Sequence, residues 1–261
     1  MRETADHLVS WLLERVQMSG QPPIDLVELS QRMGVVSISE AEMVEDGRLE
    51  QRSGAATIYV RSDLSPARRH FTIAHELGHR LLLHPRAPAT AYRRRLTGDQ
   101  EERLCDDIAA AIILPRRWVQ EEFSGSPQRL RTIRRMAAMS SASLSASLVR
   151  LREVHRWPQS LLWFTPYEGR WRLAAPAGVP SEMHGRLRTT ARTSQALEEI
   201  GAETAADVFA VLPIRVETRD LHFRAELSVR RGSAVALVDL SKSIGPRAPS
   251  NGQSGRHPPL S

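Results

Sequence analysis

The sequence has almost no cysteine and no long apolar run. Its one cysteine, Cys105, excludes an internal disulfide. The longest apolar stretch, residues 108–114, has seven residues, whereas a membrane helix needs roughly 20. The first residues also lack the basic segment, apolar run and cleavage site of a secretion signal. We therefore expect a soluble, cytoplasmic protein that does not contact a membrane.

Lysine is also nearly absent, because Lys242 is the only one, so the positive charge comes almost entirely from arginine. The formal net charge is +6. Residues 129–156 alone hold seven arginines against one acidic residue, Glu153, an excess as large as that of the whole chain. A basic excess is typical of proteins that bind nucleic acid. Here the excess is local, so such binding would be confined to this segment.

Apolar residues make up 41% of the chain, enough for a hydrophobic core. Their spacing predicts a mixed α+β fold. Ser65 followed by Pro66 is typical of a helix start, and the polar stretch 40–54 separates the first two strands. The expected helices are residues 7–17, 25–33, 65–83, 99–114, 130–139, 144–154 and 195–200. The expected strands are residues 35–39, 56–60, 161–165, 170–174, 208–216, 221–229 and 234–240.

Residues 71–79, with the sequence F-T-I-A-H-E-L-G-H, contain the pattern H-E-x-x-H. The four-residue spacing of His75 and His79 places both imidazoles on one helix face, one turn apart, where they can hold one metal ion. Glu76 lies about 100° around the helix from His75. It is therefore suited to take a proton from a water molecule at the metal instead of binding the metal itself. The pattern predicts a catalytic zinc site.

A catalytic zinc needs a third protein ligand. The extended metzincin pattern is excluded, because Leu82 and Pro85 stand where it requires glycine and histidine. His84 would lie about 180° around the helix from His75. A carboxylate of the next helix is the better candidate. Spacing alone leaves four of them open: Glu101, Glu102, Asp106 and Asp107.

Residues 71–79 and 102–115, the second reading E-R-L-C-D-D-I-A-A-A-I-I-L-P, together resemble the ImmA/IrrE family of zinc metallopeptidases. Residues 23–35 resemble the N-terminal helix of that family. The resemblance implies a zincin-like fold, with zinc, or else manganese or cobalt, as the metal. It also implies Glu102, thirteen residues before Pro115, as the third ligand. In the same comparison Asp106 could accept a hydrogen bond from a ligand histidine.

Residues 130–151 have the length and short polar break of a helix-turn-helix. The IrrE or PprI regulators of the family are similar here, with a peptidase domain followed by such a segment. We favour a helical hairpin packed on the peptidase domain, because the residues that would read DNA bases are small and lack Asn, Gln or Arg. Direct DNA binding stays possible. The small residues are Ser141, Ala142, Ser143, Ser145 and Ser147.

The chain should therefore contain four parts. They are a zincin-like metallopeptidase domain (1–125), a basic helix-turn-helix-like segment (126–157), a small α/β domain (158–240) and a disordered tail (241–261).

The expected function is an endopeptidase that cuts one specific intracellular protein. The resemblance implies that this protein is a helix-turn-helix transcriptional repressor, so that its cleavage derepresses genes. The alternative is a DNA-binding regulator with a structural or vestigial metal site, against which Glu76 argues, since a structural site needs no general base. Cys105 is expected to be buried and inert. The donor that stabilises an oxyanion is left open among His70, Tyr59 and Tyr92.

Overall fold

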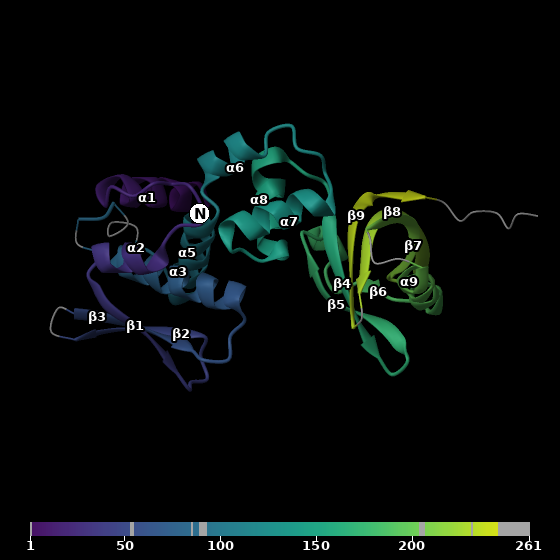
Figure 1. Cartoon of the computed structure of the whole chain (residues 1–261), viewed down its shortest axis with the longest axis horizontal. Helices are drawn as coiled ribbons and strands as arrows, with labels where there is room; N and C mark the ends of the chain where they lie inside the picture. The colour runs from purple at the N-terminus through teal and green to yellow at the C-terminus, as the bar shows by residue number, and fades with distance from the viewer. Residues whose placement is uncertain are drawn as a thin grey trace, which may run out of the picture. The chain divides into compact units, whose positions relative to one another are not determined.

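The computed structural model describes residues 2–52, 55–84, 86–88, 93–203, 207–230 and 232–244. The chain forms two compact units, unit 1 (Met1–Trp157) and unit 2 (Pro158–Ser261) (Figure 1). Both combine helices with strands, which confirms the α+β class. Unit 1 covers the residues of the first two expected parts, 1–125 and 126–157, as one compact unit.

Unit 1 has a three-stranded sheet of order β1-β3-β2, in which β1 is parallel and β2 antiparallel to β3. On β3, Ala56, Ile58 and Val60 are buried and alternate with more exposed residues, so one face of the sheet lies on the core. The sequence pattern does not predict β2, because β2 is an edge strand of mainly polar residues. The strands are β1 (Val35–Ala41), β2 (Gly47–Arg52) and β3 (Ala55–Arg61).

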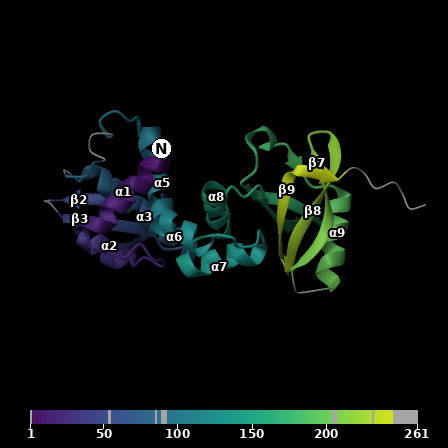
Figure 2. The same cartoon turned by 90° about the horizontal axis from the view of Figure 1, so that it is seen from above.

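Helices α3 and α5 pack side by side in unit 1 (Figure 2). Gly78 permits their close approach, since a Cβ at this position would lie 3.2 Å from the Cα of Cys105. Pro115 ends α5, as expected, and also caps α6, which the sequence pattern does not predict. The helices are α1 (Arg2–Arg15), α2 (Leu26–Arg32), α3 (Pro66–Leu83), α5 (Gly98–Ile113), α6 (Arg116–Glu122), α7 (Leu130–Ser140) and α8 (Leu144–His155).

Helices α7 and α8, the last two of unit 1, are joined by a three-residue connection. It begins at Ser141, whose φ is 59°. Arg150 of α8 is 4% exposed, and its Nε donates to the carbonyl of Leu114 at 2.9 Å. The same guanidinium pairs with Glu153 at 3.1 Å and with Asp6 of α1. These bonds tie α8 to the end of α5 and to α1. At least one arginine of the basic segment is therefore a buried structural residue.

Unit 2 is an antiparallel sheet of order β5-β4-β9-β8-β7-β6, with α9 packed on β5, β7 and β8. Leu197 of α9 is buried among sheet residues such as Phe164 and Phe223. The β4–β5 turn has positive φ at Glu168 (48°) and Gly169 (71°), as tight hairpin turns require. The elements are β4 (Ser160–Tyr167), β5 (Arg170–Ala177), β6 (Leu187–Arg188), α9 (Ala191–Glu203), β7 (Val208–Val216), β8 (Arg219–Arg230) and β9 (Ser233–Ile244), with a 3-10 turn at Ser181–Met183.

The expected disordered tail begins inside β9, because this strand extends to Ile244. Strand pairing explains the difference, since His222 and Phe223 of β8 pair with Ile244 and Ser243. The remaining tail residues, 245–261, lie outside the described residues.

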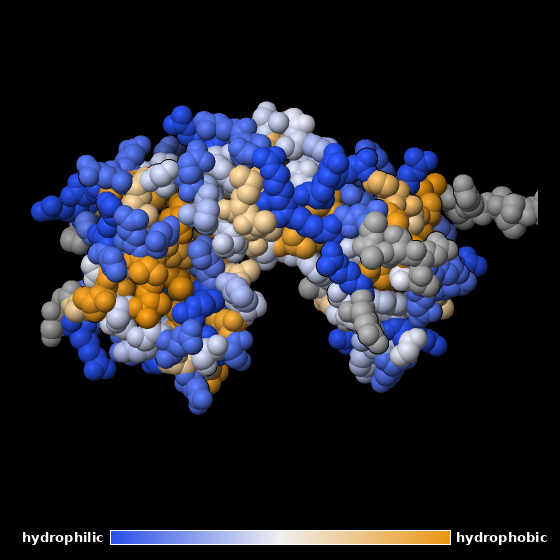
Figure 3. All heavy atoms as spheres, viewed as in Figure 1, coloured by the Kyte–Doolittle hydropathy of each residue, from blue (hydrophilic) through white to orange (hydrophobic). Residues whose placement is uncertain are grey.

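Hydrophilic residues cover most of the visible surface, and hydrophobic atoms appear there in several separate patches (Figure 3). Among the described residues of unit 1, the most exposed large hydrophobic side chains are Val44 (89%) and Val36 (66%), both on or near the sheet. None of the helices in the described ranges combines the length and hydropathy that a membrane span requires.

Candidate metal centre

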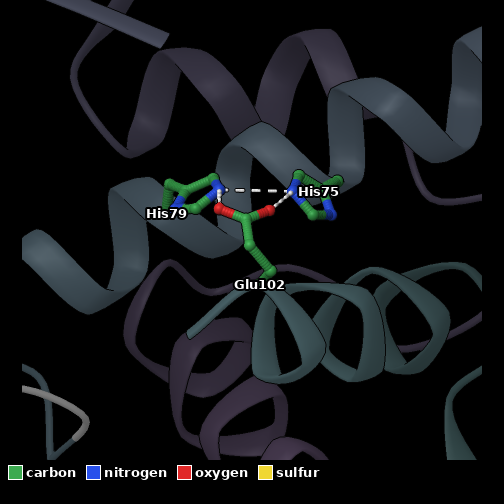
Figure 4. A group of neighbouring side chains, drawn as sticks. All are labelled: His75, His79 and Glu102. Carbon is green, nitrogen blue, oxygen red and sulfur yellow. Dashed lines mark hydrogen bonds and ion pairs between the residues drawn. The ribbon is translucent and has the colours of Figure 1, made fainter. Parts of the chain in front are cut away.

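His75 and His79 project from α3 toward Glu102 of the neighbouring helix α5 (Figure 4). The Nε2 atoms of the two histidines lie 3.2 Å apart. One carboxylate oxygen of Glu102 is 3.2 Å from Nε2 of His75, and the other is 3.4 Å from Nε2 of His79. Three donor groups thus converge on one point.

These separations suit a zinc ion. Zinc bonds of about 2.0 to 2.1 Å in a tetrahedral arrangement separate neighbouring ligand atoms by about 3.3 Å. The contacts among the three groups, 3.2 Å between the two Nε2 atoms and 3.2 and 3.4 Å from these atoms to the two different oxygens of Glu102, are close to this value. Two imidazole nitrogens and a carboxylate oxygen also form the donor set of many catalytic zinc sites. The residues therefore fit the metal that the motif predicts.

The outer nitrogen of each histidine faces another carboxylate. Nδ1 of His75 lies 2.9 Å from Asp106, and Nδ1 of His79 lies 3.6 Å from Glu101. Only the contact of His75 is within hydrogen-bond range. Because a carboxylate can only accept a hydrogen bond, a neutral His75 donates its Nδ1–H to Asp106 and turns the lone pair of Nε2 toward the site. This Nε2 lies 3.2 Å from a carboxylate oxygen of Glu102, and a cation between the lone pair and the carboxylate would relieve their repulsion. The His75–Asp106 hydrogen bond therefore supports a cation site.

The four carboxylates that sequence spacing left open have four different environments. Only Glu102 joins the histidines in a group that could hold a metal among the described residues. Asp106 bonds to Nδ1 of His75 from behind, whereas Glu101 lies 3.6 Å from Nδ1 of His79 and pairs with Arg93 at 3.3 Å. Asp107 points away from the site and pairs with Arg2 of α1 at 3.4 Å. The position of Glu101 behind His79 was not predicted, because spacing along a helix does not show which ring a carboxylate will face.

Two further histidines of the motif region lie away from this centre. His84, expected to face the other side of α3, has its ring 6.3 Å from that of Trp11. His70 is not among the described residues that line the metal cavity, and its Nε2 is buried without a hydrogen-bond partner in the described chain. Burial lowers the pKa of the His70 imidazole.

Burial also affects the titration of the metal-site residues. It lowers the pKa of His79, which favours the neutral imidazole that metals bind. Burial alone would lower the pKa of His75 too, but the hydrogen bond and charge of Asp106, together with the charges of Glu76 and Glu102, raise that pKa.

Glu76 is 6% exposed and lies outside the ligand group. Burial raises the pKa of its carboxyl, and a hydrogen bond donated by the backbone N–H of Leu49 partly opposes this effect. A raised pKa suits a carboxylate that must accept a proton and later release it near neutral pH. Leu49 of edge strand β2 is thus bonded to Glu76 of α3, the residue that the motif predicts as the general base.

The metal centre opens into a cavity of about 640 Å³ between β2, α3 and α5. Of the three residues considered as oxyanion donors, Tyr59 and His70 do not line it in the described chain, and Tyr92 lies outside the described residues. The cationic side chains on its wall are Arg48, Arg68 and Arg93. Arg48 and Arg93 lie in stretches where the sequence predicts no helix or strand, and Arg68 lies on the expected helix 65–83 but was not singled out.

Cys105 is buried, and burial raises the pKa of its thiol. Its backbone is the surface on which Gly78 packs. The residue is therefore a packing element, and its low thiolate content does not suit redox or nucleophilic chemistry.

Replacing Asp106 with asparagine should weaken zinc binding by roughly 10- to 100-fold, the usual effect of losing the carboxylate behind a ligand histidine. The amide accepts the Nδ1–H bond more weakly and no longer favours the tautomer with Nε2 free. Competition with a chromogenic chelator measures the affinity. Asp107→Asn is the matched control, because Asp107 is adjacent in sequence but pairs with Arg2. Equal losses in both variants would contradict the assigned role of Asp106.

Replacing Gly47 with alanine should slow catalysis while zinc stays bound. The new Cβ would lie 2.4 Å from Cγ2 of Thr72 and 2.9 Å from Oε1 of Glu76, so the carboxylate or β2 must move. Misplacing a catalytic group by about 1 Å costs on the order of 100-fold in rate.

Two variants control this experiment. Gly98→Ala adds the same methyl where nothing lies within 4 Å and should leave the rate unchanged. Adding Thr72→Ser to Gly47→Ala removes Cγ2 and should restore part of the rate. Full activity in Gly47→Ala, with zinc bound, would show that β2 does not fix Glu76.

Residues 30–152 match the family model of the IrrE N-terminal-like domain of peptidase family M78. The match begins in α2 and ends in α8, so it includes the metal centre and most of the helical segment. Among solved structures, a Mycobacterium tuberculosis transcriptional regulator has a TM-score of 0.51 and 14% sequence identity, over 91% of this chain and 77% of that chain. No curated protein matches. The family resemblance is confirmed for residues 30–152, and the structural likeness shows similarity of fold alone.

Proposed function

We propose that this IrrE N-terminal-like domain is a zincin-like, zinc-dependent endopeptidase, with His75, His79 and Glu102 as metal ligands and Glu76 as general base. The substrate is one specific cytoplasmic protein, a helix-turn-helix transcriptional repressor, whose cleavage derepresses genes. One observation carries the proposal. Two imidazoles and the Glu102 carboxylate converge as a group that could hold a metal, while the buried carboxylate of Glu76 stands outside this ligand group.

Zinc, when bound, polarises a carbonyl group and lowers the pKa of water from about 15.7 toward 7. Manganese or cobalt could serve in the same way. Glu76 accepts the proton of the attacking water, a contribution of roughly 10²- to 10⁴-fold in rate. The N–H of Leu49 holds the carboxylate during this transfer. The same carboxyl then donates the proton to the amine that leaves.

The edge strand next to the cavity supports a peptide substrate. In the order β1-β3-β2, β2 has one side unpaired within its sheet, and Gly47, Arg48 and Leu49 of this strand line the cavity. An extended peptide can add to such an edge through backbone hydrogen bonds. A protein substrate must therefore present an extended segment, which limits cleavage to exposed loops or termini.

The regulatory part of the proposal rests on what surrounds the catalytic residues. The family match extends beyond α5 and α6 into α7 and α8, and the similar solved structure is described as a transcriptional regulator. Unit 2 adds a second folded unit that a bare peptidase does not need. Remote contacts from such parts can orient a single bond for cleavage.

The alternative, a DNA-binding regulator with a structural or vestigial metal site, has less support. Ala142, Ser143 and Ala146 stand where a recognition helix would begin, but they line a cavity shared with α3 and α5. Arg150 is buried and bonded within unit 1. A gel-shift assay with DNA upstream of the gene would reveal direct binding.

The purified, zinc-loaded protein should cut a helix-turn-helix repressor encoded beside its gene at one site and leave unfolded casein largely intact. Intact-mass spectrometry identifies the fragments. A chelator should abolish the cut, and added zinc should restore it. Rapid, sequence-tolerant digestion of casein would instead indicate a general peptidase and contradict the regulatory proposal.

A further inference from the structure

A second cavity of about 280 Å³ lies next to the metal cavity in unit 1. Its walls are the start of α3, the end of α5 and the start of α8. Ala67, Ala110, Ala142 and Ala146 contribute only methyl groups, which is why space remains between three packed helices. Ile113 forms part of the apolar wall and is 4% exposed. We call this cavity the α3–α8 pocket.

The α3–α8 pocket adjoins the metal cavity. Phe71 and Arg68 line both of them. Phe71 lies one helical turn before His75, and their ring centroids are 6.3 Å apart. Arg68 extends over the Phe71 ring, with its guanidinium carbon 5.6 Å from the ring centroid, and its Nε donates to Asp46 at 2.5 Å. These two side chains form the partition between the two cavities.

The lining determines what the pocket can hold. Arg68 is the one charged residue among those that line it in the described chain, and Asp46 already neutralises it. The other lining residues offer methyl groups, aliphatic side chains, an aromatic ring and two serine hydroxyls. An apolar cavity of about 150 Å³ can hold benzene. The pocket therefore has room for a leucine, methionine or phenylalanine side chain.

The distance along α3 fixes where such a side chain lies in a bound peptide. Phe71 and Ala67 precede His75 by four and eight residues, or about 6 and 12 Å of helix. An extended peptide advances about 3.3 Å per residue. A residue two to four positions from the bond at the metal therefore reaches the pocket.

We propose that the α3–α8 pocket is a specificity subsite that binds a large apolar side chain of the substrate, two to four residues from the cleaved bond. This inference rests on the proposed peptidase function. In this proposal the start of α8 takes part in substrate selection, because Ala142 and Ala146 line the subsite. It also narrows the substrate to proteins with an apolar residue near the cut.

The first test does not depend on cleavage. The zinc-loaded, ¹⁵N-labelled protein is titrated with N-acetyl-leucine amide and, separately, with N-acetyl-glycine amide. The leucine probe should shift the amide signals of Ala110, Ala142 and Ala146, and the glycine probe should not. Ala146→Leu fills the pocket and should weaken leucine binding by about 10- to 100-fold. Ala138→Leu, an exposed position on α7, is the matched control and should bind as the wild type does.

The second test measures selectivity with a proteome-derived peptide mixture and mass spectrometry. Wild type and Ala138→Leu should favour Leu, Met or Phe over Gly by about 10- to 100-fold at one position two to four residues from the cut. Ala146→Leu should lose this preference, keep its zinc and still cut peptides with small residues there.

The outcomes separate this inference from the proposed function. Absence of leucine-specific shifts, or a preference that Ala146→Leu leaves unchanged, overturns the subsite. Leucine-specific shifts without cleavage of any peptide or repressor would instead overturn the peptidase function, and with it the assignment of the pocket as a substrate subsite. Shifts together with the lost preference support both.

Discussion

The Glu76→Gln variant should retain a full complement of zinc and cleave its substrate slower by roughly 10²- to 10⁴-fold. Glutamine has nearly the same shape, and its amide oxygen can still accept the hydrogen bond from Leu49, so the fold and the ligand group are preserved. The amide cannot accept a proton from water. Zinc content is measured by mass spectrometry of the metal, and cleavage by the rate of fragment formation.

A neighbouring carboxylate provides the control for this variant. Glu45 lines the same cavity but is exposed, so Glu45→Gln makes the same chemical change without touching the buried base. It should leave the rate within a small factor of wild type. A Glu76→Gln protein that cleaves at the wild-type rate would eliminate the assigned role of Glu76, and one that loses zinc would show that Glu76 is a ligand.

The Glu102→Ala variant should lose bound zinc and all cleavage. Two histidines would be left as protein ligands, whereas catalytic zinc sites have three. The loss of affinity should exceed the roughly 10- to 100-fold expected for the outer carboxylates, so Glu101→Ala and Asp106→Ala serve as matched comparisons on the same helix. Chelator competition gives the affinities, and thermal melting of the metal-free proteins checks folding. A larger loss in Glu101→Ala or Asp106→Ala would reassign the third ligand.

The sequence predicts that His75 and His79 lie side by side, because the placement of two residues one turn apart depends only on helical geometry. Spacing could not select the third ligand, because that choice depends on how α5 is rotated against α3. The contact of Gly78 with Cys105 sets how closely the two helices approach, and the spacing of either segment alone does not reveal it. The resemblance to a known family supplied Glu102, and the structure brings that residue to the histidines.

Strand β2 shows a second reason why sequence patterns miss part of the fold. Residues 47–52 are mostly polar because an edge strand buries little of its surface, so the alternation that identifies β3 is weak in β2. Because β2 was not predicted, the positions of Gly47 and Leu49 next to Glu76 were not predicted either. The same limit applies to α6, which is only seven residues long and follows directly on Pro115. Both elements depend on tertiary packing that local patterns do not reveal.

The most direct test of the account compares the protein N-termini of two strains that differ only in Glu76→Gln, in cells that encode this protein. Mass spectrometry should find one or very few new N-termini that require the wild-type protein, and they should lie in a helix-turn-helix repressor, two to four residues from an apolar side chain. Expression of the genes under that repressor should rise only in the wild-type strain. If no N-terminus depends on Glu76 while the same genes still respond in both strains, the protein regulates without proteolysis and the central claim is wrong.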